Sequence, residues 1–195
     1  MLSLLASMAW EPRTAASLRS YWRGKWQLAK EMSYERGGLS GTFTGCAACK
    51  HSRCMVRSAH AAHTTCSGRA EFSPIDDGWL AYAESGVALL GSDSFEARRS
   101  LLYQHGSSGP VRCYFDDSPE ARTVDARIEA ARFFHEISLE GSGVPFLHPC
   151  GPDVYRGRLV LESADAFRFD WRVTGPRKQG WITNRFRREP GPEFE

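Results

Sequence analysis

One short stretch of the sequence collects several residues able to do chemistry, His148-Pro149-Cys150-Gly151-Pro152-Asp153-Val154-Tyr155. On an extended chain His148 and Cys150 share one face, and Asp153 and Tyr155 share another. A Cys beside a His can form a nucleophilic thiolate, and an Asp can orient the imidazole. Cys150, His148 and Asp153 are therefore the candidate catalytic residues. The alternative is a polar plug, in which Asp153 caps a turn, Tyr155 bonds a carbonyl and His148 satisfies buried backbone groups.

A second candidate is His135, which period-two spacing places on an apolar strand face with Phe133, Ile137 and Leu139. A histidine that faces the interior of a barrel could ligate a haem iron or bond a small ligand. The alternative is a core histidine whose hydrogen bonds are satisfied by neighbouring groups.

Tyr82 and Glu84 lie two residues apart and so share one face of an expected strand. If that face is buried, Glu84 needs a partner, because an unpaired buried carboxylate is costly. His135 or Arg69 would serve as that partner. If the face is the outer one, the pair has no functional meaning.

A segment rich in cysteine and histidine suggests a metal site. Its cysteines are Cys46, Cys49, Cys54 and Cys66, and His51, His60 and His63 lie between them. The spacing is irregular, with one Cys-x-x-Cys pair and no matching second pair, so a surface loop is the preferred interpretation over zinc. The sequence contains no Walker loop, G-x-S-x-G elbow, Rossmann fingerprint or H-E-x-x-H motif.

The composition is that of one globular domain of 195 residues, with 42% hydrophobic and 25% charged residues. The net charge of +2 argues against a nucleic-acid partner, which would need a basic footprint. No apolar run approaches the roughly 20 residues that span a membrane, and the N-terminus lacks the basic region of a secretory signal. We expect reduced thiols and a soluble intracellular protein, cytoplasmic unless Arg13, Arg19 and Arg23 belong to an organellar presequence.

The elements that must position these residues are mainly strands. Residues 167–174 alternate strictly between apolar and polar, which predicts a strand with one buried face. Residues 14–23 and 120–131 are the helical exceptions. Rougher alternation recurs in residues 39–45, 80–88, 111–115, 133–139, 154–161 and 181–187.

Turn residues separate these runs at the spacing of a barrel, so we predict a mainly β fold, a closed antiparallel barrel of about nine to eleven strands with a short N-terminal helix. Two segments, about 46–67 and 118–131, interrupt the rhythm and are interpreted as insertions. The expected organisation is an N-terminal extension over residues 1–19, the barrel over 20–188 and a tail over 189–195.

Gly24-Lys25-Trp26 opens the first long strand and predicts how the barrel closes. In lipocalin-like barrels such a Trp lies across the closed end, with a basic residue of the last strand stacked on it. Arg185 or Arg187 would supply that basic group. Gly24, Trp26 and Arg185 are thus the predicted closure residues.

With these motifs placed, the chain resembles the family called domain of unknown function 6314, over most of residues 20–188. The most specific matches are the His148…Tyr155 block and the block from Trp171 to Lys178. Further matches are Gly24-Lys25-Trp26, the Gly41…Phe43…Gly45 strand, Ala70-Glu71-Phe72, Leu80 to Gly86, Tyr114-Phe115-Asp116, Arg132-Phe133-Phe134-His135 and Arg185. The resemblance implies a calycin-like barrel and no established activity. The departures are the two insertions, of which the second stretches a family turn from Asp116 or Asp117 to Arg132.

The function expected from these features is binding of a small, partly apolar molecule in the barrel interior, with no membrane or nucleic-acid partner. An enzyme using Cys150 and His148, a haem-binding barrel using His135, and an assembly protein with a filled barrel are the alternatives. No cofactor is assigned. The expected ligand contacts are His135, His148, Cys150, Asp153, Tyr155, Trp171, Glu84 and Tyr82.

Overall fold

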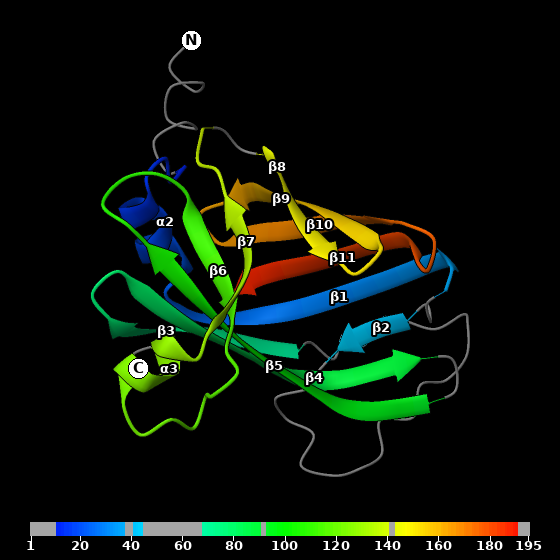
Figure 1. Ribbon diagram of the computed structural model, residues 1–195, viewed down its shortest axis with the longest axis horizontal. Helices are drawn as coiled ribbons and strands as arrows, with labels where there is room; N and C mark the ends of the chain where they lie inside the picture. The colour runs from blue at the N-terminus through cyan, green and yellow to red at the C-terminus, as the bar shows by residue number, and fades with distance from the viewer. Residues whose placement is uncertain (1–10, 38–40, 45–67, 91–92, 141–142, 191–195) are drawn as a thin grey trace.

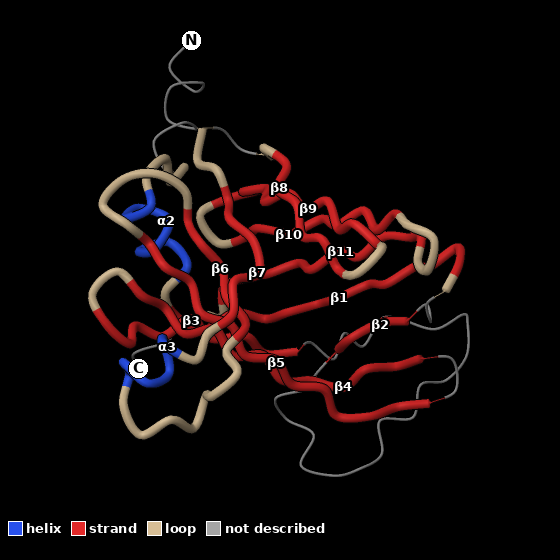
Figure 2. The backbone as a smooth tube through the Cα atoms, viewed as in Figure 1, coloured by secondary structure: helices blue, strands red, loops and turns tan. Residues whose placement is uncertain are grey.

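In the computed structural model, eleven antiparallel strands form one sheet that curls into a nearly closed barrel (Figures 1 and 2). The structure describes residues 11–37, 41–44, 68–90, 93–140 and 143–190. The elements are α2 (Ala15–Trp22), β1 (Gly24–Arg36), β2 (Gly41–Thr44), β3 (Gly68–Asp76), β4 (Trp79–Leu90), β5 (Asp93–His105), β6 (Val111–Phe115), α3 (Val124–Glu129), β7 (Arg132–Ile137), β8 (Pro145–Cys150), β9 (Asp153–Ser163), β10 (Ala166–Thr174) and β11 (Gln179–Arg188). The predicted fold class is confirmed. Neither described helix is long and apolar enough to cross a membrane.

The order of the strands around the barrel leaves one seam. It runs β7-β6-β5-β4, then β2 and β3, and then β1-β11-β10-β9-β8. β7 and β8 come next to each other where the circle closes, but within the described residues no ladder of backbone hydrogen bonds joins them. Every other junction is hydrogen-bonded, so the barrel is continuous except at the β7–β8 seam.

β2 and β3 occupy a single strand position between β1 and β4. Phe43 lies opposite Lys30, and Gly68 lies opposite Leu28 on the same strand. Since partners in an antiparallel ladder step in opposite directions, Thr44 and Gly68 are consecutive positions of this ladder. The ladder with β4 gives the same result, because Thr44 pairs with Val87 and Arg69 with Ser85. The registers are therefore those of one strand that residues 45–67 interrupt.

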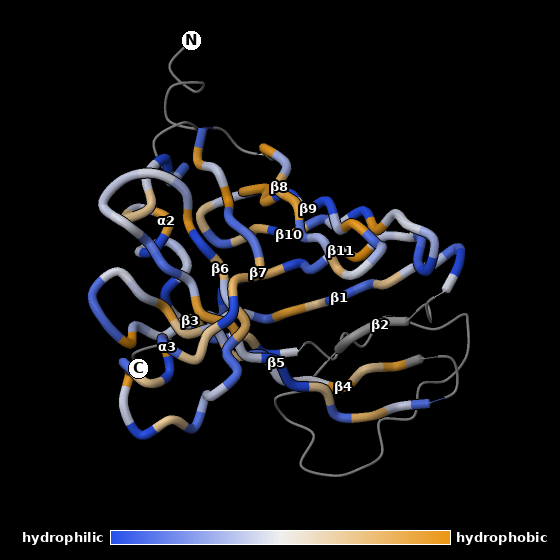
Figure 3. The backbone as a smooth tube through the Cα atoms, viewed as in Figure 1, coloured by the Kyte–Doolittle hydropathy of each residue, from blue (hydrophilic) through white to orange (hydrophobic). Residues whose placement is uncertain are grey.

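Hydrophobic and hydrophilic residues alternate along several strands, as the colours of Figure 3 show, and the inward set fills the interior. On β10 the predicted set Phe167, Phe169, Trp171 and Val173 is buried. At one end of the barrel α2 inserts Leu18 and Trp22, both fully buried. The helix begins where the sequence predicts it, because Thr14 and Ser17 form a reciprocal capping box.

The α2 end of the lumen is packed with aromatic rings. Phe167 stacks on Phe186 at 4.3 Å with an interplanar angle of 5° and meets Trp26 edge-on at 4.8 Å. Trp22 stacks on Phe72 at 5.4 Å. Trp26 in turn donates its indole N–H to the carbonyl of Trp22 at 2.7 Å. This end of the barrel is therefore closed by packed rings.

Barrel closure uses Trp26 as predicted, but the arginine is Arg188. Its guanidinium carbon lies 4.2 Å from the centroid of the Trp26 ring, and it donates to the carbonyls of Tyr21 and Arg23 at 2.7 and 3.1 Å. The prediction of Arg185 was wrong, since Arg185 points outward. Phe186 is buried, so period two places residue 188, and not 185 or 187, on the inner face.

The segment over residues 118–131 forms α3 beside an intact β6–β7 hairpin. Asp116, whose side chain is fully buried, accepts hydrogen bonds from the guanidinium of Arg127 in α3, with the Nε–Oδ2 distance 3.1 Å. Arg132 pairs with Asp117 at the base of the segment. The hairpin register runs from Val111 opposite Ile137 to Phe115 opposite Arg132, so the stretched turn leaves the strand pairing in place.

Candidate functional site

A buried ionic group lies in the half of the lumen away from α2. Lys30 on β1 forms an ion pair with Glu84 on β4, and the hydroxyl of Tyr82 donates to the other oxygen of the same carboxylate. Glu84 is 7% exposed. The predicted partners His135 and Arg69 do not fill this role, because Arg69 reaches Glu189 at 3.4 Å on the outside of the barrel. The sequence left open whether Tyr82 and Glu84 face inward or outward. In the structure both side chains lie on the buried, inward face.

Burial shifts the pKa values of this group in opposite directions. Burial lowers the pKa of Lys30, although Glu84 acts against that shift. Burial, and then the charge of Glu84, raise the pKa of Tyr82 well above its ordinary value. Tyr82 is therefore a neutral hydrogen-bond donor near pH 7.

Arg99 is the second cation of this half of the lumen. It lies on β5 directly opposite Glu84 in the β4–β5 ladder, on the inward face that continues to the buried Leu101 and Tyr103. Its guanidinium carbon is 5.1 Å from the centroid of the Phe134 ring. Within the part of the chain that the structure describes, no carboxylate lies within ion-pair distance of Arg99.

His135 lies on the same wall, 1% exposed, between two aromatic rings. Its imidazole stacks on Phe146 at 4.5 Å and 16°, and Trp171 meets it edge-on at 5.3 Å. Its Nδ1 has no hydrogen-bond partner among the described residues. Burial, followed by the charges of Arg99 and His148, lowers the pKa of His135 to about 3, so the ring is neutral near pH 7.

A β-bulge aims His135 inward and corrects one prediction. Cys113 pairs with His135 and Tyr114 with Phe133, which leaves Phe134 as the extra residue on β7. Phe134 and His135 are both buried, while Phe133 is 57% exposed. The prediction that Phe133 shares the face of His135 was therefore wrong, because the bulge breaks the period of two.

Gly157 makes room for the rings around His135. It lies opposite both Phe146 and Trp171 in the ladders of β9. A Cβ atom at this position would lie 2.4 Å from the Phe146 ring and 2.8 Å from the Trp171 ring. Only a glycine allows the two rings to lie over the backbone of β9 and to contact His135.

Side chains close the seam between β7 and β8. The Nδ1 of His148 on β8 donates to the carbonyl of Phe134 on β7 at 2.9 Å, since a carbonyl can only accept. The His148 ring also packs against Phe134 at 4.4 Å. Together with the stack of His135 on Phe146, these contacts replace the missing ladder bonds.

These side chains enclose a cavity of about 30 Å³. Besides aromatic rings such as Phe134 and Trp171, its wall carries seven polar side chains: Lys30, Tyr82, Glu84, Arg99, Tyr103, His135 and Asn184. The Oδ1 of Asn184, like Nδ1 of His135, is buried and has no partner among the described residues. The space suffices for a water molecule. A haem on His135 would have to displace Phe146 and Trp171.

A larger hollow of about 290 Å³ lies beside α2, between the ends of β7 and β9, and is separate from the first cavity. Its floor is apolar, formed by Leu18, Ile137 and Leu159, and its charged residues are at the rim. No unsatisfied buried side-chain atom within the described residues belongs to its lining. We therefore place the candidate site in the lumen.

The predicted catalytic residues are not gathered around Cys150. Asp153 is 4% exposed, and its Oδ1 accepts from the backbone N–H groups of Arg177 and Lys178 at 2.9 and 3.2 Å. It thus holds the β10–β11 turn, while Cys150 is exposed. Tyr155 is half-buried, with its ring 6.1 Å from that of His148. A catalytic role for Cys150 stays a prediction.

The predicted zinc ligands Cys46, Cys49, Cys54 and Cys66 lie outside the described residues. Among the residues that are described, no group of three or more His, Cys, Asp or Glu side chains could hold a metal ion.

Comparison with known proteins agrees with this fold. The family of unknown function DUF6314 matches residues 22–188. The chain belongs to this family. No curated protein gives a significant match. Among solved structures, the S-type phycobiliprotein lyase CPES from Guillardia theta superposes with a TM-score of 0.50 at 5% identity, over 91% of this chain and 94% of that one. A barrel titled EF1p2_mFAP2b bound to DFHBI has a TM-score of 0.40 at 11% identity, over 92% of this chain and all of that one.

All the cavity residues of this DUF6314 protein lie within the matched segment. Of the ligand contacts expected from the sequence, Tyr82, Glu84, His135 and Trp171 lie on the cavity wall. The sequence analysis missed Lys30, Arg99 and Asn184. Their signal was the alternation itself, since Lys30 follows Trp26 and Leu28, Arg99 precedes Leu101 and Tyr103, and Asn184 precedes Phe186, each in steps of two.

Proposed function

We propose that this protein binds a small molecule in the half of the lumen away from α2. The observation that carries the proposal is the pair of buried, unsatisfied atoms on one cavity wall, Nδ1 of His135 and Oδ1 of Asn184. Leaving such an atom without a partner costs about 1–3 kcal/mol. Two such atoms beside the same cavity favour a binding site, in which polar groups of the ligand would form the missing hydrogen bonds.

The rest of the wall suits a ligand with a planar, partly apolar body. Phe134 and Trp171 are stacked at 5.8 Å and 22°, and Phe169 and Phe186 line the cavity below them. Aromatic faces of this kind provide contact area, while the few polar groups would fix the orientation of the ligand.

Binding requires the cavity to expand, because ligand pockets usually measure about 300–1,000 Å³. The β7–β8 seam is the access route that the contacts favour. Opening it breaks the hydrogen bond between His148 and Phe134 and several ring contacts, whereas any other junction between described strands would lose a ladder of backbone bonds. Phe134 and His135 belong both to the seam and to the cavity wall.

The second candidate function is a filled structural barrel without a ligand. It is favoured by the small volume of the cavity, about 30 Å³, which one or two water molecules could fill.

Mass spectrometry of the purified protein separates the two candidates. The native mass is compared with the denatured mass, and a retained molecule appears as a difference that disappears on denaturation. The variant Asn184→Leu, which removes an unsatisfied atom, should retain less of that molecule than Thr183→Val on the same strand. An empty native protein that also binds none of a panel of small aromatic acids and alcohols would support the filled barrel.

A further inference from the structure

We propose that the ligand is an anion and that Arg99 receives its negative group. This inference rests on the proposed function and specifies its ligand class, a small molecule with a carboxylate, sulfonate or phosphate group on a planar, partly apolar body.

The charges around the cavity carry the inference. Lys30 and Glu84 neutralise each other as an ion pair. His135 is neutral near pH 7 because its pKa is lowered to about 3, and burial raises the pKa of Tyr82, which keeps it neutral as well. Arg99 remains, so the cavity wall formed by described residues has a surplus of one positive charge.

The charge of Arg99 affects the ionisation of several other side chains on the cavity wall. Its charge lowers the pKa of His135 and favours ionisation of Tyr82 and Tyr103, against the stronger effect of burial. A guanidinium held over the Phe134 ring presents planar N–H donors, the geometry that suits two oxygens of one anionic group. A polar group on the body of the same ligand would reach His135 or Asn184 on the wall.

The described acidic residues near Arg99 are already paired. On its own strand Glu96 is exposed and lies 3.6 Å from Arg98. Directly after β6, Asp116 donates its backbone N–H to the carbonyl of Ser100, and its carboxylate is bound by Arg127. Across the barrel Asp170 is on the outer face, where Arg158 and Arg168 hold it at 3.1 and 3.0 Å.

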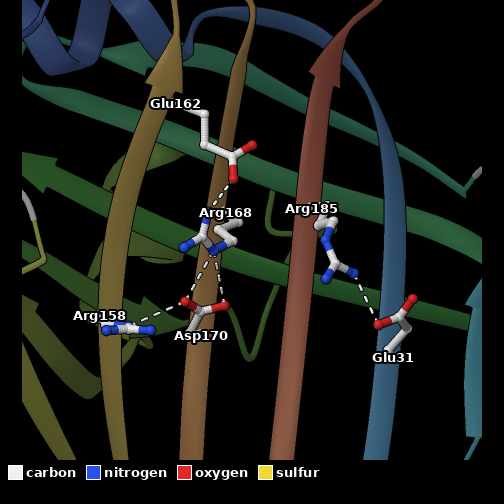
Figure 4. Close-up of polar contacts among 6 residues, drawn as sticks. All are labelled: Glu31, Arg158, Glu162, Arg168, Asp170 and Arg185. Atoms are coloured by element: carbon white, nitrogen blue, oxygen red, sulfur yellow. Dashed lines mark hydrogen bonds and ion pairs between the residues drawn. The ribbon is translucent and has the colours of Figure 1, made fainter.

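Figure 4 shows this outer network, with Arg185 bonded to Glu31 at 2.9 Å beside the Asp170 group. These pairs neutralise arginines that water also reaches. Arg99 is half-buried like Arg168, but it differs in facing the lumen and in having no described carboxylate within ion-pair distance.

Two fluorescent probes with the same anilinonaphthalene body test the inference. 1-Anilinonaphthalene-8-sulfonate carries a negative charge, and N-phenyl-1-naphthylamine does not. We expect the anionic probe to bind at least as tightly as the more apolar neutral one. Arg99→Met should weaken the anionic probe about 10- to 100-fold, the loss expected for a charge-assisted hydrogen bond in a shielded site, and leave the neutral probe within about 2-fold.

The matched control is Arg98→Met, the neighbouring arginine on the outer face of the same strand. It should leave the affinity of both probes unchanged, and near-ultraviolet circular dichroism should show that both variants keep native packing. If the neutral probe binds and Arg99→Met does not weaken the anionic one, the anion inference is overturned while the proposed function stands. If neither probe binds, the proposed function fails as well. If Arg98→Met weakens the anionic probe as much as Arg99→Met, the probe reads surface charge and the inference is overturned.

Discussion

At the α2 end of the lumen Trp22, Trp26 and Phe167 pack against one another, whereas the opposite end contains Lys30, Glu84, Arg99 and His135 around about 30 Å³ of space. The first end is assembled from ring contacts, and its one indole–carbonyl bond joins neighbours within it. The second end buries the ion pair of Lys30 and Glu84, in which each charge stabilises the other. It also borders the unpaired β7–β8 seam and the strand position that β2 and β3 share.

This contrast separates the part of the barrel that stabilises the fold from the part where we propose a binding site. Close-packed aromatic rings contribute most of the stability, since burying large side chains is the main favourable term in folding. Buried ion pairs contribute little or nothing net, but removing one partner is strongly destabilising. The closely packed rings and the proposed binding site thus lie at different ends of one lumen.

The largest expected effect comes from breaking the packed end. Phe167→Ala should lower the free energy of unfolding by about 4 kcal/mol, because the ring is fully buried between Trp26 and Phe186. Phe134→Ala at the polar end should cost less, about 2–3 kcal/mol, since that ring already borders a cavity. Urea denaturation of both variants measures the difference. Equal costs would contradict the division of the lumen.

The next effect separates burial of a charge from loss of a contact. Lys30→Met should cost about 3 kcal/mol, because it leaves the carboxylate of Glu84 buried beside Tyr82 with no cation paired to it. The double variant Lys30→Met/Glu84→Leu should recover most of that loss. The exposed pair of Arg185 and Glu31 is the control, and Arg185→Met should cost under about 1 kcal/mol. A double variant as unstable as Lys30→Met would show that the pair itself stabilises the barrel.

Each end also contains one buried histidine, which makes stability depend on pH. Burial lowers the pKa of His105 to about 4 and that of His135 to about 3, both below the usual 6.5 of an unfolded chain. Between those values the unfolded state binds a proton that the folded state does not, so stability falls as the pH falls from about 6.5. For His105 alone the loss amounts to at most about 3 kcal/mol by pH 4.

Unfolding curves between pH 5 and 7 measure this slope. His105→Phe and His135→Phe should each remove part of it, because phenylalanine keeps the ring and has no proton to gain. A slope that neither variant changes would assign the pH dependence to other groups.

The smallest expected loss of stability tests the interrupted strand at the polar end. Joining Thr44 directly to Gly68 by deleting residues 45–67 should not lower the free energy of unfolding, since the registers on β1 and β4 stay in place and the deletion removes a chain-closure cost of up to about 3 kcal/mol. Deleting residues 45–66 instead adds one residue to the strand, which would shift the faces of the following side chains. That variant should be less stable. Similar stability of the two deletions would contradict the single-strand interpretation.

Local sequence patterns predict the elements and the inner face of most strands. Strict alternation over Phe167–Thr174 reports burial directly, because side chains of a strand point to opposite faces at every step. The cap at Thr14 and the closing Trp26 are likewise local signals. The same alternation contained Arg188, Lys30 and Arg99, and extending each strand by two residues would have found them.

Tertiary structure decided the rest. The bulge at Phe134 depends on how β6 pairs with β7, so no pattern within β7 could predict that Phe134 and His135 both turn inward. The partner of Glu84 is 54 residues away, and Asp153 holds a turn 24 residues further along the chain instead of orienting His148. Local periodicity fixes which way a side chain points, but only the closed barrel determines which inward side chains meet, because contacts across the lumen join strands in an order that periodicity does not encode.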